Sequence, residues 1–180
     1  MCAAVDYIRS DYYRYVGRRD SLLKIFIYSL KNHCFRFCFW LRLSSIKNPV
    51  RPFARVMRAH LASRYGILIS RKTRIGYGLY IGHGYGIVVN SSAIIGNNCN
   101  LSQFTTIGAN DGPAAVIGDN VYIGPNVCLV ENVHIGNNVT IGAGAVVTRD
   151  IPADATAVGV PAKVVNNDTP ARYINNKWSV

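Results

Sequence analysis

The sequence predicts a mainly β protein in which short strands wind into a parallel β-helix, preceded by an α-helical region. Three observations support this fold class: an aliphatic residue recurs every sixth position, glycine often follows it, and the repeat begins only at Ile69. A period of six fits neither an amphipathic helix nor an alternating strand. The expected boundaries are 1–66 for a basic α-helical N-terminal region, 67–152 for the β-helix and 153–180 for a C-terminal extension.

The repeat has two interruptions. Its frame slips by two residues between Ile87 and Val89, and a break at 109–116 precedes the last coils. Glycine and asparagine at the corners tolerate the left-handed backbone that tight corners need. Three strands close one triangular coil, so stacked coils bury a continuous aliphatic column. The repeating residues are Ile69, Ile75, Ile81, Ile87, Val89, Ile95, Leu101, Ile107, Ile117, Ile123, Leu129, Ile135, Ile141 and Val147.

The positive charge of the chain is concentrated in its first part. Residues 1–74 contain 16 Lys or Arg against three acids, whereas 75–180 contain four against six. A basic segment suits an anionic membrane surface, an anionic substrate or nucleic acid, and a solvated helical face is the plain alternative. Nucleic acid is not expected as a partner, because the sequence carries no nucleic-acid-binding motif.

Helices are expected over 11–17, 21–44 and 50–65, with turns between them. Their apolar side chains require burial against each other or against a neighbouring subunit. Three charges in 25–43 argue against a membrane-spanning helix but not against one lying on a membrane surface. The apolar residues concerned are Leu22, Leu23, Phe26, Ile27, Phe37, Phe39, Trp40 and Leu41.

The cysteines are expected to be reduced thiols of a cytoplasmic protein, because their number is odd and their spacing irregular. His33 with Cys34 and Cys38 lacks a second ligand pair at zinc-site spacing, so no metal is expected and buried thiols on one helix face are favoured. The five cysteines are Cys2, Cys34, Cys38, Cys99 and Cys128.

The repeat register, IGAGAVVTRDIP at 141–152 and GVPAK at 159–163 together resemble the left-handed β-helix acyltransferases. GLYIGHGYGIVVN at 78–90 and LSQFTTIG at 101–108 resemble the serine acetyltransferase branch, including its relatives in bacterial polysaccharide gene clusters. The resemblance covers about 69–165. It implies left-handed coils, a homotrimer, and O-acetyl transfer with acetyl-CoA as the donor.

His83 is the candidate general base, because it lies in a Gly-His-Gly context and aligns with the catalytic histidine of that branch. A thiolate leaves readily, since a thiol pKa is near ~8.5, so one imidazole can be the main catalyst. A corner histidine without a catalytic role is the alternative. His33, His60 and His134 lack this context and are interpreted as surface or packing residues.

The aspartate that orients the histidine in serine acetyltransferases corresponds to Leu68 here, so that partner is absent. A backbone carbonyl or Asp11 could replace it. Asp11, Tyr85 and Gln103 are therefore the candidates for orienting His83 or contacting the acceptor.

The resemblance places the coenzyme contacts at small residues on coil edges and at basic residues after the last coil. Small residues allow the pantetheine amides to approach the backbone, although each glycine is equally explained as a plain corner. Lys163, with Arg149 second, is the expected phosphate partner. The small residues are Gly108, Ala109, Gly124, Pro125, Gly142 and Ala143.

The expected acceptor is a sugar hydroxyl in bacterial capsular polysaccharide, exopolysaccharide or lipopolysaccharide biosynthesis. Gly82 stands where the serine enzymes carry an acid, and the loop at 109–116 lacks their Arg-His pair. An amino acid's charges would be left unpaired, which is costly. Aromatic residues near the histidine are expected to line a carbohydrate-binding face, and the basic region to contact anionic lipid where lipid-linked precursors are assembled. These aromatic residues are Tyr77, Tyr80, Tyr85 and Phe104.

Two alternatives stay open: a serine O-acetyltransferase, and a non-catalytic β-helix scaffold. A zinc carbonic anhydrase on the same fold is disfavoured, because it needs three converging histidines and only His83 and His134 lie in the repeats.

Overall fold

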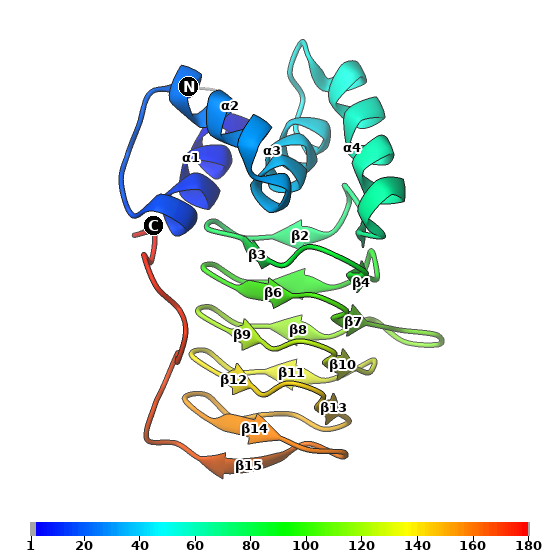
Figure 1. Ribbon diagram of the computed structural model, residues 1–180. Coiled ribbons are helices and arrows are strands. Elements are labelled where there is room, and N and C mark those ends of the chain that lie inside the picture. Colours follow the sequence, from blue (N-terminus) through cyan, green and yellow to red (C-terminus); the bar gives the residue numbers. More distant parts are fainter. Residues whose placement is uncertain (1–2, 180) are drawn as a thin grey trace.

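Four α-helices cover one end of a left-handed parallel β-helix, and the last segment of the chain returns along its side to the first helix (Figure 1). The computed structural model describes residues 3–179, so Cys2 lies outside the described residues. The helices are α1 (Ala3–Val16), α2 (Leu22–Lys31), α3 (His33–Ser45) and α4 (Arg51–Tyr65).

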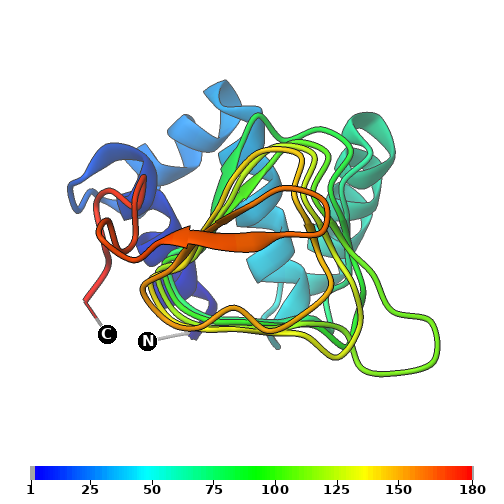
Figure 2. The same cartoon turned by 90° about the horizontal axis from the view of Figure 1, so that it is seen from below.

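The strands form three sheets, one on each side of the triangular cross-section in Figure 2. Sheet A contains β1 (Leu68–Ile69), β4 (Val88–Val89), β7 (Thr106–Ile107), β10 (Cys128–Leu129) and β13 (Val146–Val147). Sheet B contains β2 (Arg74–Ile75), β5 (Ile94–Ile95), β8 (Val116–Ile117) and β11 (His134–Ile135). Sheet C contains β3 (Tyr80–Gly82), β6 (Asn100–Ser102), β9 (Tyr122–Ile123), β12 (Thr140–Ile141), β14 (Thr156–Val158) and β15 (Lys163–Asn166).

The six-residue period is confirmed, and its aliphatic residues form the axial column. In sheet C, Ile81, Leu101, Ile123 and Ile141 lie in register on successive coils, and all are fully buried. Asparagines at one stacked corner, such as Asn98 with φ 55°, have the expected left-handed backbone. Each short strand is thus held by its neighbours in the stack and by the column it covers.

The solenoid continues beyond residue 152, where the sequence pattern ended it. β14 pairs in parallel with β12, and β15 adds an antiparallel strand at the far edge. Ala157 takes the inward position next to Ile141 and is fully buried. It was not recognised as a repeat position, because alanine is not one of the large aliphatic residues that define the pattern.

The single helix expected over 21–44 is wrong, because the chain breaks at Asn32 into α2 and α3. Asn32 has extended backbone angles, and its side-chain oxygen accepts a hydrogen bond from the N–H of Phe35 at 2.9 Å. This is an N-cap, which satisfies one of the free donors at the start of α3. The break brings the start of α3 to the side of the solenoid.

The outward face of α2 is not buried within this chain, so of the two expected kinds of burial only packing against a neighbouring subunit is left for it. Phe37 and Leu41 of α3 are buried, whereas Leu23 is 69% exposed and Leu30 is 55% exposed. Leu22, Phe26 and Ile27 on the same helix are also exposed. Across residues 3–179, no helix is long and apolar enough to cross a membrane.

Within the described chain the cysteines are free, and Cys34, Cys38 and Cys99 are buried. Burial raises the pKa of Cys99 to about 12, so this thiol stays protonated. Cys34 and Cys38 lie one turn apart on α3, which confirms the expected pair of buried thiols on one helix face.

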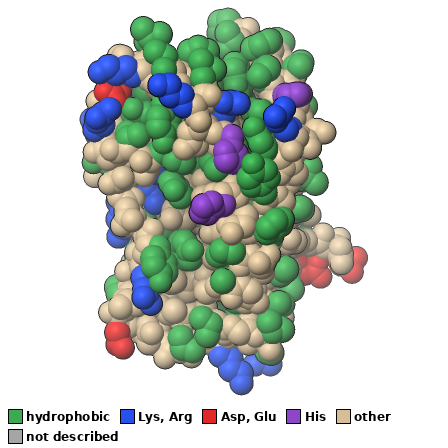
Figure 3. Space-filling model, viewed as in Figure 1, with side chains coloured by type: hydrophobic (Ala, Val, Ile, Leu, Met, Phe, Trp, Pro, Cys, Tyr) green, Lys and Arg blue, Asp and Glu red, His purple; other side chains and the backbone are tan. Residues whose placement is uncertain are grey.

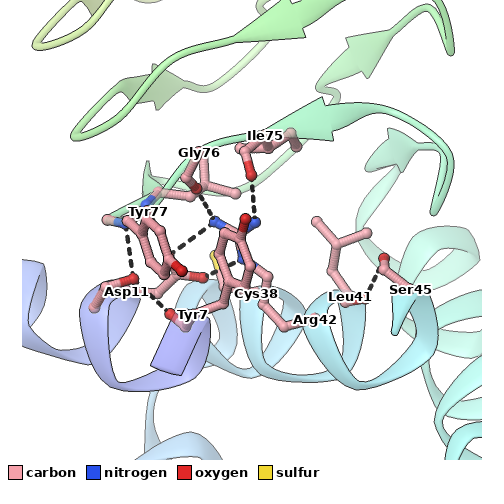
Figure 4. A network of polar contacts seen from close by, with 12 residues as sticks. Tyr7, Asp11, Cys38, Leu41, Arg42, Ser45, Ile75, Gly76 and Tyr77 are labelled. Carbon is pink, nitrogen blue, oxygen red and sulfur yellow. Dashed lines mark hydrogen bonds and ion pairs between the residues drawn. The ribbon is translucent and has the colours of Figure 1, made fainter. Parts of the chain in front are cut away.

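The first coil has no coil above it, and α1 and α3 supply the missing hydrogen-bond partners (Figure 4). Arg42 donates to the carbonyls of Ile75 and Gly76 at 2.8 and 2.6 Å. It also forms a bidentate ion pair with Asp11 at 2.8 and 3.0 Å, and Asp11 accepts the N–H of Leu79 at 2.7 Å. Burial raises the pKa of Asp11, while Arg42 and the Leu79 N–H oppose that rise.

Two further side chains of α1 complete this cap. The Tyr15 hydroxyl both donates to the carbonyl of Ile81 and accepts its N–H, each at 3.0 Å. The Ser10 hydroxyl accepts the N–H of Gly78 at 2.9 Å. Without these side chains, the backbone N–H and carbonyl groups that they bind would be buried without a hydrogen-bond partner, which costs about 1–3 kcal/mol for each group.

We predict that Arg42→Ala lowers the free energy of unfolding by about 3–5 kcal/mol, because it leaves the Asp11 carboxylate buried without its partner. Urea denaturation measures the effect. Arg18→Ala is the matched control, since Arg18 pairs with Asp20 at the surface with its side chain 72% exposed, and it should change stability little. Equal stability loss in the two variants would contradict this account of the cap.

Candidate functional site

His83 lies on a two-residue insertion at one corner of the first coil. Gly82 and Val88 are in register with Ser102 and Thr106 of the next coil, so five residues span this corner where three span the one beneath. This insertion is the frame slip detected in the sequence. His83 has φ 52°, and this left-handed backbone directs an exposed imidazole outward from the corner.

The imidazole borders a pocket of about 670 Å³ between the helical cap, sheet C and the C-terminal segment. Histidine side chains reach the surface where the cap meets the solenoid (Figure 3). The lining comes from α1, the α2–α3 junction, β3, β6, β9 and the segment at 173–176. Its residues are Arg14, Tyr15, Lys31, Asn32, His33, Cys34, Tyr80, Ile81, Gly82, His83, Asn100, Ser102, Tyr122, Tyr173, Asn175 and Asn176.

The start of α3 holds the inserted corner in place. The Cys34 sulfur accepts the N–H of Gly84, the residue after His83, at 3.1 Å. Burial raises the pKa of Cys34, so its sulfur serves as a neutral acceptor. Gly84 is itself buried. This contact holds the backbone directly after His83, a residue whose left-handed backbone conformation would otherwise be disfavoured.

His33 is a packing residue, as the sequence indicates, but its place beside His83 in the pocket is not evident from the sequence. Its ring does pack on Tyr65 and Tyr85, at centroid distances of 5.1 and 5.3 Å, but it also lines the pocket with His83. Burial lowers the pKa of His33, and the positive charges of Arg36 and of protonated His83 lower it further. No sequence motif marks it, since α3 brings it to the solenoid.

The pocket lining carries cations but no carboxylate among the described residues. Arg14 is 4% exposed and donates to the carbonyls of Asn175 and Gly78 and to the side-chain oxygen of Asn100, at 2.7–2.9 Å. Burial lowers the pKa of Arg14. With its donors engaged, Arg14 braces the pocket wall, while Lys31 is exposed at the rim.

The three candidates for orienting His83 or contacting the acceptor are not among the residues that line the pocket. Asp11 is fully buried in its pair with Arg42 and does not line the pocket. Tyr85 is 46% exposed and packs on the ring of His33. Gln103, on the coil below, has a buried side-chain oxygen with no partner in the described chain.

The aromatic lining differs from the one expected. Tyr80 lines the pocket, but Tyr77 stacks on Tyr7 at 4.2 Å, and Phe104 is 53% exposed beside Gly86 rather than in the pocket. The structure adds aromatic residues that no motif marked: Tyr15, Tyr122 and Tyr173. Tyr80 lies on β3, just before the corner of His83, whereas Tyr15 and Tyr173 come from parts of the chain outside the repeats.

The residues expected to contact the coenzyme lie at two different corners. Gly124, Pro125, Gly142 and Ala143 lie at the corner below His83, where the Gly144 N–H donates to the Pro125 carbonyl at 2.8 Å. Gly108 and Ala109 follow β7 at the next corner, at the start of the loop 108–115 that projects from the solenoid in Figure 2. Arg149 and Lys163 are exposed, the latter on β15.

Two of these glycines differ in what the fold itself requires. A Cβ at Gly124 would lie 2.9 Å from the backbone of the coil below, so coil stacking alone explains this glycine. A Cβ at Gly108 would meet nothing nearer than a carbonyl oxygen at 4.0 Å. Gly108 therefore borders open space, in which the amide groups of a ligand would fit.

Chemically, the site combines an exposed imidazole, a wall of protonated tyrosine hydroxyls and side-chain amides, and a positive electrostatic environment. Burial raises the pKa values of Tyr15 and Tyr80, so both remain neutral donors. Within residues 3–179, no cluster of three or more His, Cys, Asp or Glu side chains could hold a metal ion. This arrangement is suited to removing a proton from a hydroxyl group bound in the pocket.

Comparisons with known proteins agree with this fold. Residues 114–149 match the family model for bacterial transferase hexapeptide (six repeats). A serine acetyltransferase from Synechococcus elongatus is 34% identical over 137 residues, which are 73% of this chain and 54% of that protein. The chain thus spans about half the length of the curated relatives it matches.

Two solved structures are similar along most of the chain. Soybean serine acetyltransferase complexed with serine is 30% identical, with a TM-score of 0.66, over 91% of this chain and 68% of that one. Serine acetyltransferase in complex with coenzyme A from Brucella abortus strain S19 is 25% identical, with a TM-score of 0.74, over 89% and 66%. The chain belongs to the hexapeptide-repeat transferase family, in its serine acetyltransferase-like branch.

We predict that protonation of His33 destabilises the folded protein. Between the lowered pKa of His33 in the folded state and the usual value of 6.5, the unfolded state binds more protons. The free energy of unfolding should therefore fall as the pH drops below 6.5. His33→Phe keeps the ring packing but cannot titrate, so its denaturation midpoint should fall less with pH than that of the wild type.

His134→Gln is the matched control, because His134 lies exposed on β11. It should retain the pH dependence of the wild type. If His33→Phe loses stability on acidification as steeply as the wild type, protonation of His33 does not contribute.

Proposed function

We propose that this protein is an acetyl-CoA-dependent O-acetyltransferase with His83 as its general base. The observation that supports this proposal most directly is the inserted left-handed corner, which places His83 beside a pocket of about 670 Å³. Family membership supports the reaction class, since the relatives named above are serine acetyltransferases and one of them was solved with coenzyme A.

In the proposed reaction, an imidazole nitrogen of His83 accepts the proton of the acceptor hydroxyl as its oxygen attacks the thioester carbonyl. The carbon–sulfur bond then breaks, and the thiolate leaves as coenzyme A while the acetyl group stays on the acceptor oxygen. The proton taken by His83 passes to the thiolate or to water. A general base contributes about 10²–10⁴-fold to such a step.

The donor substrate is proposed to lie along the coil edges. Gly108, which borders open space, and Ala109 would take the amides of the pantetheine arm, and Gly124, Pro125, Gly142 and Ala143 would contact the same molecule. The exposed cations Arg149 and Lys163 are the proposed partners of its phosphates. The two sets of small residues lie at different corners of one chain. In the expected homotrimer, the corner of one subunit that carries one set would lie against the corner of another subunit that carries the other set. That assembly stays a prediction.

For the acceptor, the comparisons favour L-serine over the sugar hydroxyl expected from the sequence, because the named relatives are serine acetyltransferases. One observation favours a saccharide as the second candidate. No carboxylate lines the described pocket, so the ammonium group of serine would have no ionic partner there. A neutral polyhydroxylated acceptor needs none.

We predict that His83→Asn lowers kcat by at least a hundredfold while leaving the fold intact. Asparagine tolerates the left-handed backbone at this corner, so the variant removes the base without straining the insertion. Thiol release from acetyl-CoA would be measured with L-serine and with methyl glycosides as acceptors. His134→Asn, on the solenoid but outside the pocket, is the matched control and should keep wild-type rates.

The same assay identifies the acceptor. Release with L-serine alone would establish a serine O-acetyltransferase, and release with glycosides alone would establish a saccharide O-acetyltransferase. Undiminished activity in His83→Asn would show that another residue is the base. Absence of thiol release with every acceptor would favour the non-catalytic scaffold.

Cytoplasmic location and contact with anionic membranes stay predictions. The exposed apolar face of α2, with Lys24 and Lys31 on the same helix, supports a surface-lying helix. We predict that the protein floats with vesicles containing phosphatidylglycerol and not with pure phosphatidylcholine, and that Leu23→Glu abolishes flotation. Val165→Glu, an exposed position on β15, is the control. Unchanged flotation of Leu23→Glu would rule out α2 as the contact.

A further inference from the structure

The C-terminal segment 167–179 forms a strap that runs back from the far end of the solenoid to α1. Figure 1 shows it in red along one side of the coils, and Figure 2 shows its end beside α1. It begins beyond β15 and passes the edge of sheet C, so it crosses the coils that carry the pocket wall.

Side chains at the edge of sheet C hold the strap along its length. Thr140 and Asn100 donate to the carbonyls of Arg172 and Tyr173, at 3.5 and 3.2 Å. The N–H of Ala171 donates to the carbonyl of Asn138 at 2.7 Å. The strap thus follows a ladder of polar side chains from coil to coil.

The end of the strap is fixed to the helical cap and the first coils. Asn98 and the backbone of Trp178 exchange two hydrogen bonds, at 2.8 and 3.1 Å. The Trp178 ring packs edge-on against Tyr13 at 5.6 Å and lies under the guanidinium of Arg19 at 4.7 Å. Arg14 donates to the carbonyl of Asn175 at 2.9 Å. These contacts make the strap an ordered wall.

This wall places an aromatic surface in the same pocket as His83. Tyr173 of the strap is 53% exposed, and its ring lies 4.9 Å from that of Tyr122 on β9, tilted by 53°. Asn175 and Asn176 also line the pocket, and the side-chain amide of Asn176 donates to the carbonyl of Arg14 at 3.3 Å. The guanidinium of Arg172 lies 4.9 Å from the centroid of the Tyr173 ring. The wall therefore offers two aromatic rings, one of them beside a cation, together with asparagine side chains.

Such a surface fits a saccharide acceptor better than it fits L-serine. A sugar ring has an apolar face of C–H groups, which aromatic rings bury, and a rim of hydroxyls, which amides bind without a net charge. A pocket of about 670 Å³ is in the range that encloses a ligand much larger than a single amino acid. The absence of a carboxylate from the described lining points the same way.

We propose that the strap, together with Tyr122 on β9, forms the wall that determines which acceptor the enzyme binds. Tyr173 and Tyr122 stack on the ring of a saccharide acceptor, while His83 removes the proton of one of its hydroxyls. This inference rests on the proposed acetyl transfer and names its acceptor class. It assigns the C-terminal strap, which lies outside the repeats, to substrate recognition.

The test compares wild type, Tyr173→Ala, Tyr173→Phe and Tyr122→Ala, with methyl glycosides of hexoses and N-acetylhexosamines as probes. Each alanine variant should raise the KM for the preferred glycoside about tenfold or more with little change in kcat, because ring stacking contributes to ground-state binding. Tyr173→Phe should keep the wild-type KM. Lys177→Ala, on the strap but outside the pocket lining, is the control.

Saturation-transfer NMR gives a readout that needs no catalysis, since stacked aromatic protons transfer magnetisation to the bound glycoside. Wild type should show transfer, and Tyr173→Ala and Tyr122→Ala should lose it while circular dichroism shows them folded. Equal glycoside KM and transfer in wild type and both alanine variants would overturn the inference, as would L-serine being the sole acceptor. If no acceptor releases thiol, the proposed function fails, and the NMR comparison still decides whether the wall binds sugar.

Discussion

The open edge of the first coil is the constraint on which the rest of this structure depends. A parallel β-helix satisfies its backbone groups through the coils above and below, so its first coil lacks one set of partners. Here the partners are side chains, and the buried Arg42–Asp11 pair is the centre of the set. The helical region is therefore part of the fold of the solenoid, because without it polar backbone would be buried unpaired or the edge would stay exposed.

The same contacts assemble the candidate site. Tyr15 and Arg14 project from the helix that caps β3, and both also line the pocket. Cys34, at the start of α3, holds the inserted corner next to His83. Capping the solenoid and building the pocket thus use the same elements, so a loss of cap stability would be expected to disturb the geometry of the site as well.

Family membership and the lining of the pocket favour different acceptors: the relatives favour serine, and the lining favours a saccharide. The relatives are named for serine, and this chain shares their fold. The described pocket, however, has a lining of tyrosines, amides and cations without a carboxylate. In the proposed reaction, the chemistry depends on the base and the thioester, whereas the choice of acceptor would depend on the pocket wall that contacts the acceptor. That wall combines Tyr173 of the strap, outside the repeats, with Tyr122 of β9.

The sequence by itself determined the coils, because each six-residue repeat carries its own signals: an inward aliphatic residue, a small residue and a left-handed corner such as Asn98. It also located the inserted corner at His83 through the frame slip. Only the tertiary structure decided that Asp11 pairs with Arg42, that His33 borders the pocket, and that Tyr173 faces it. The physical reason is distance along the chain. A repeat is specified by neighbouring residues, whereas these segments are joined by contacts such as Asp11–Arg42 and Arg14–Asn175, which are 31 and 161 residues apart, and no local pattern encodes them.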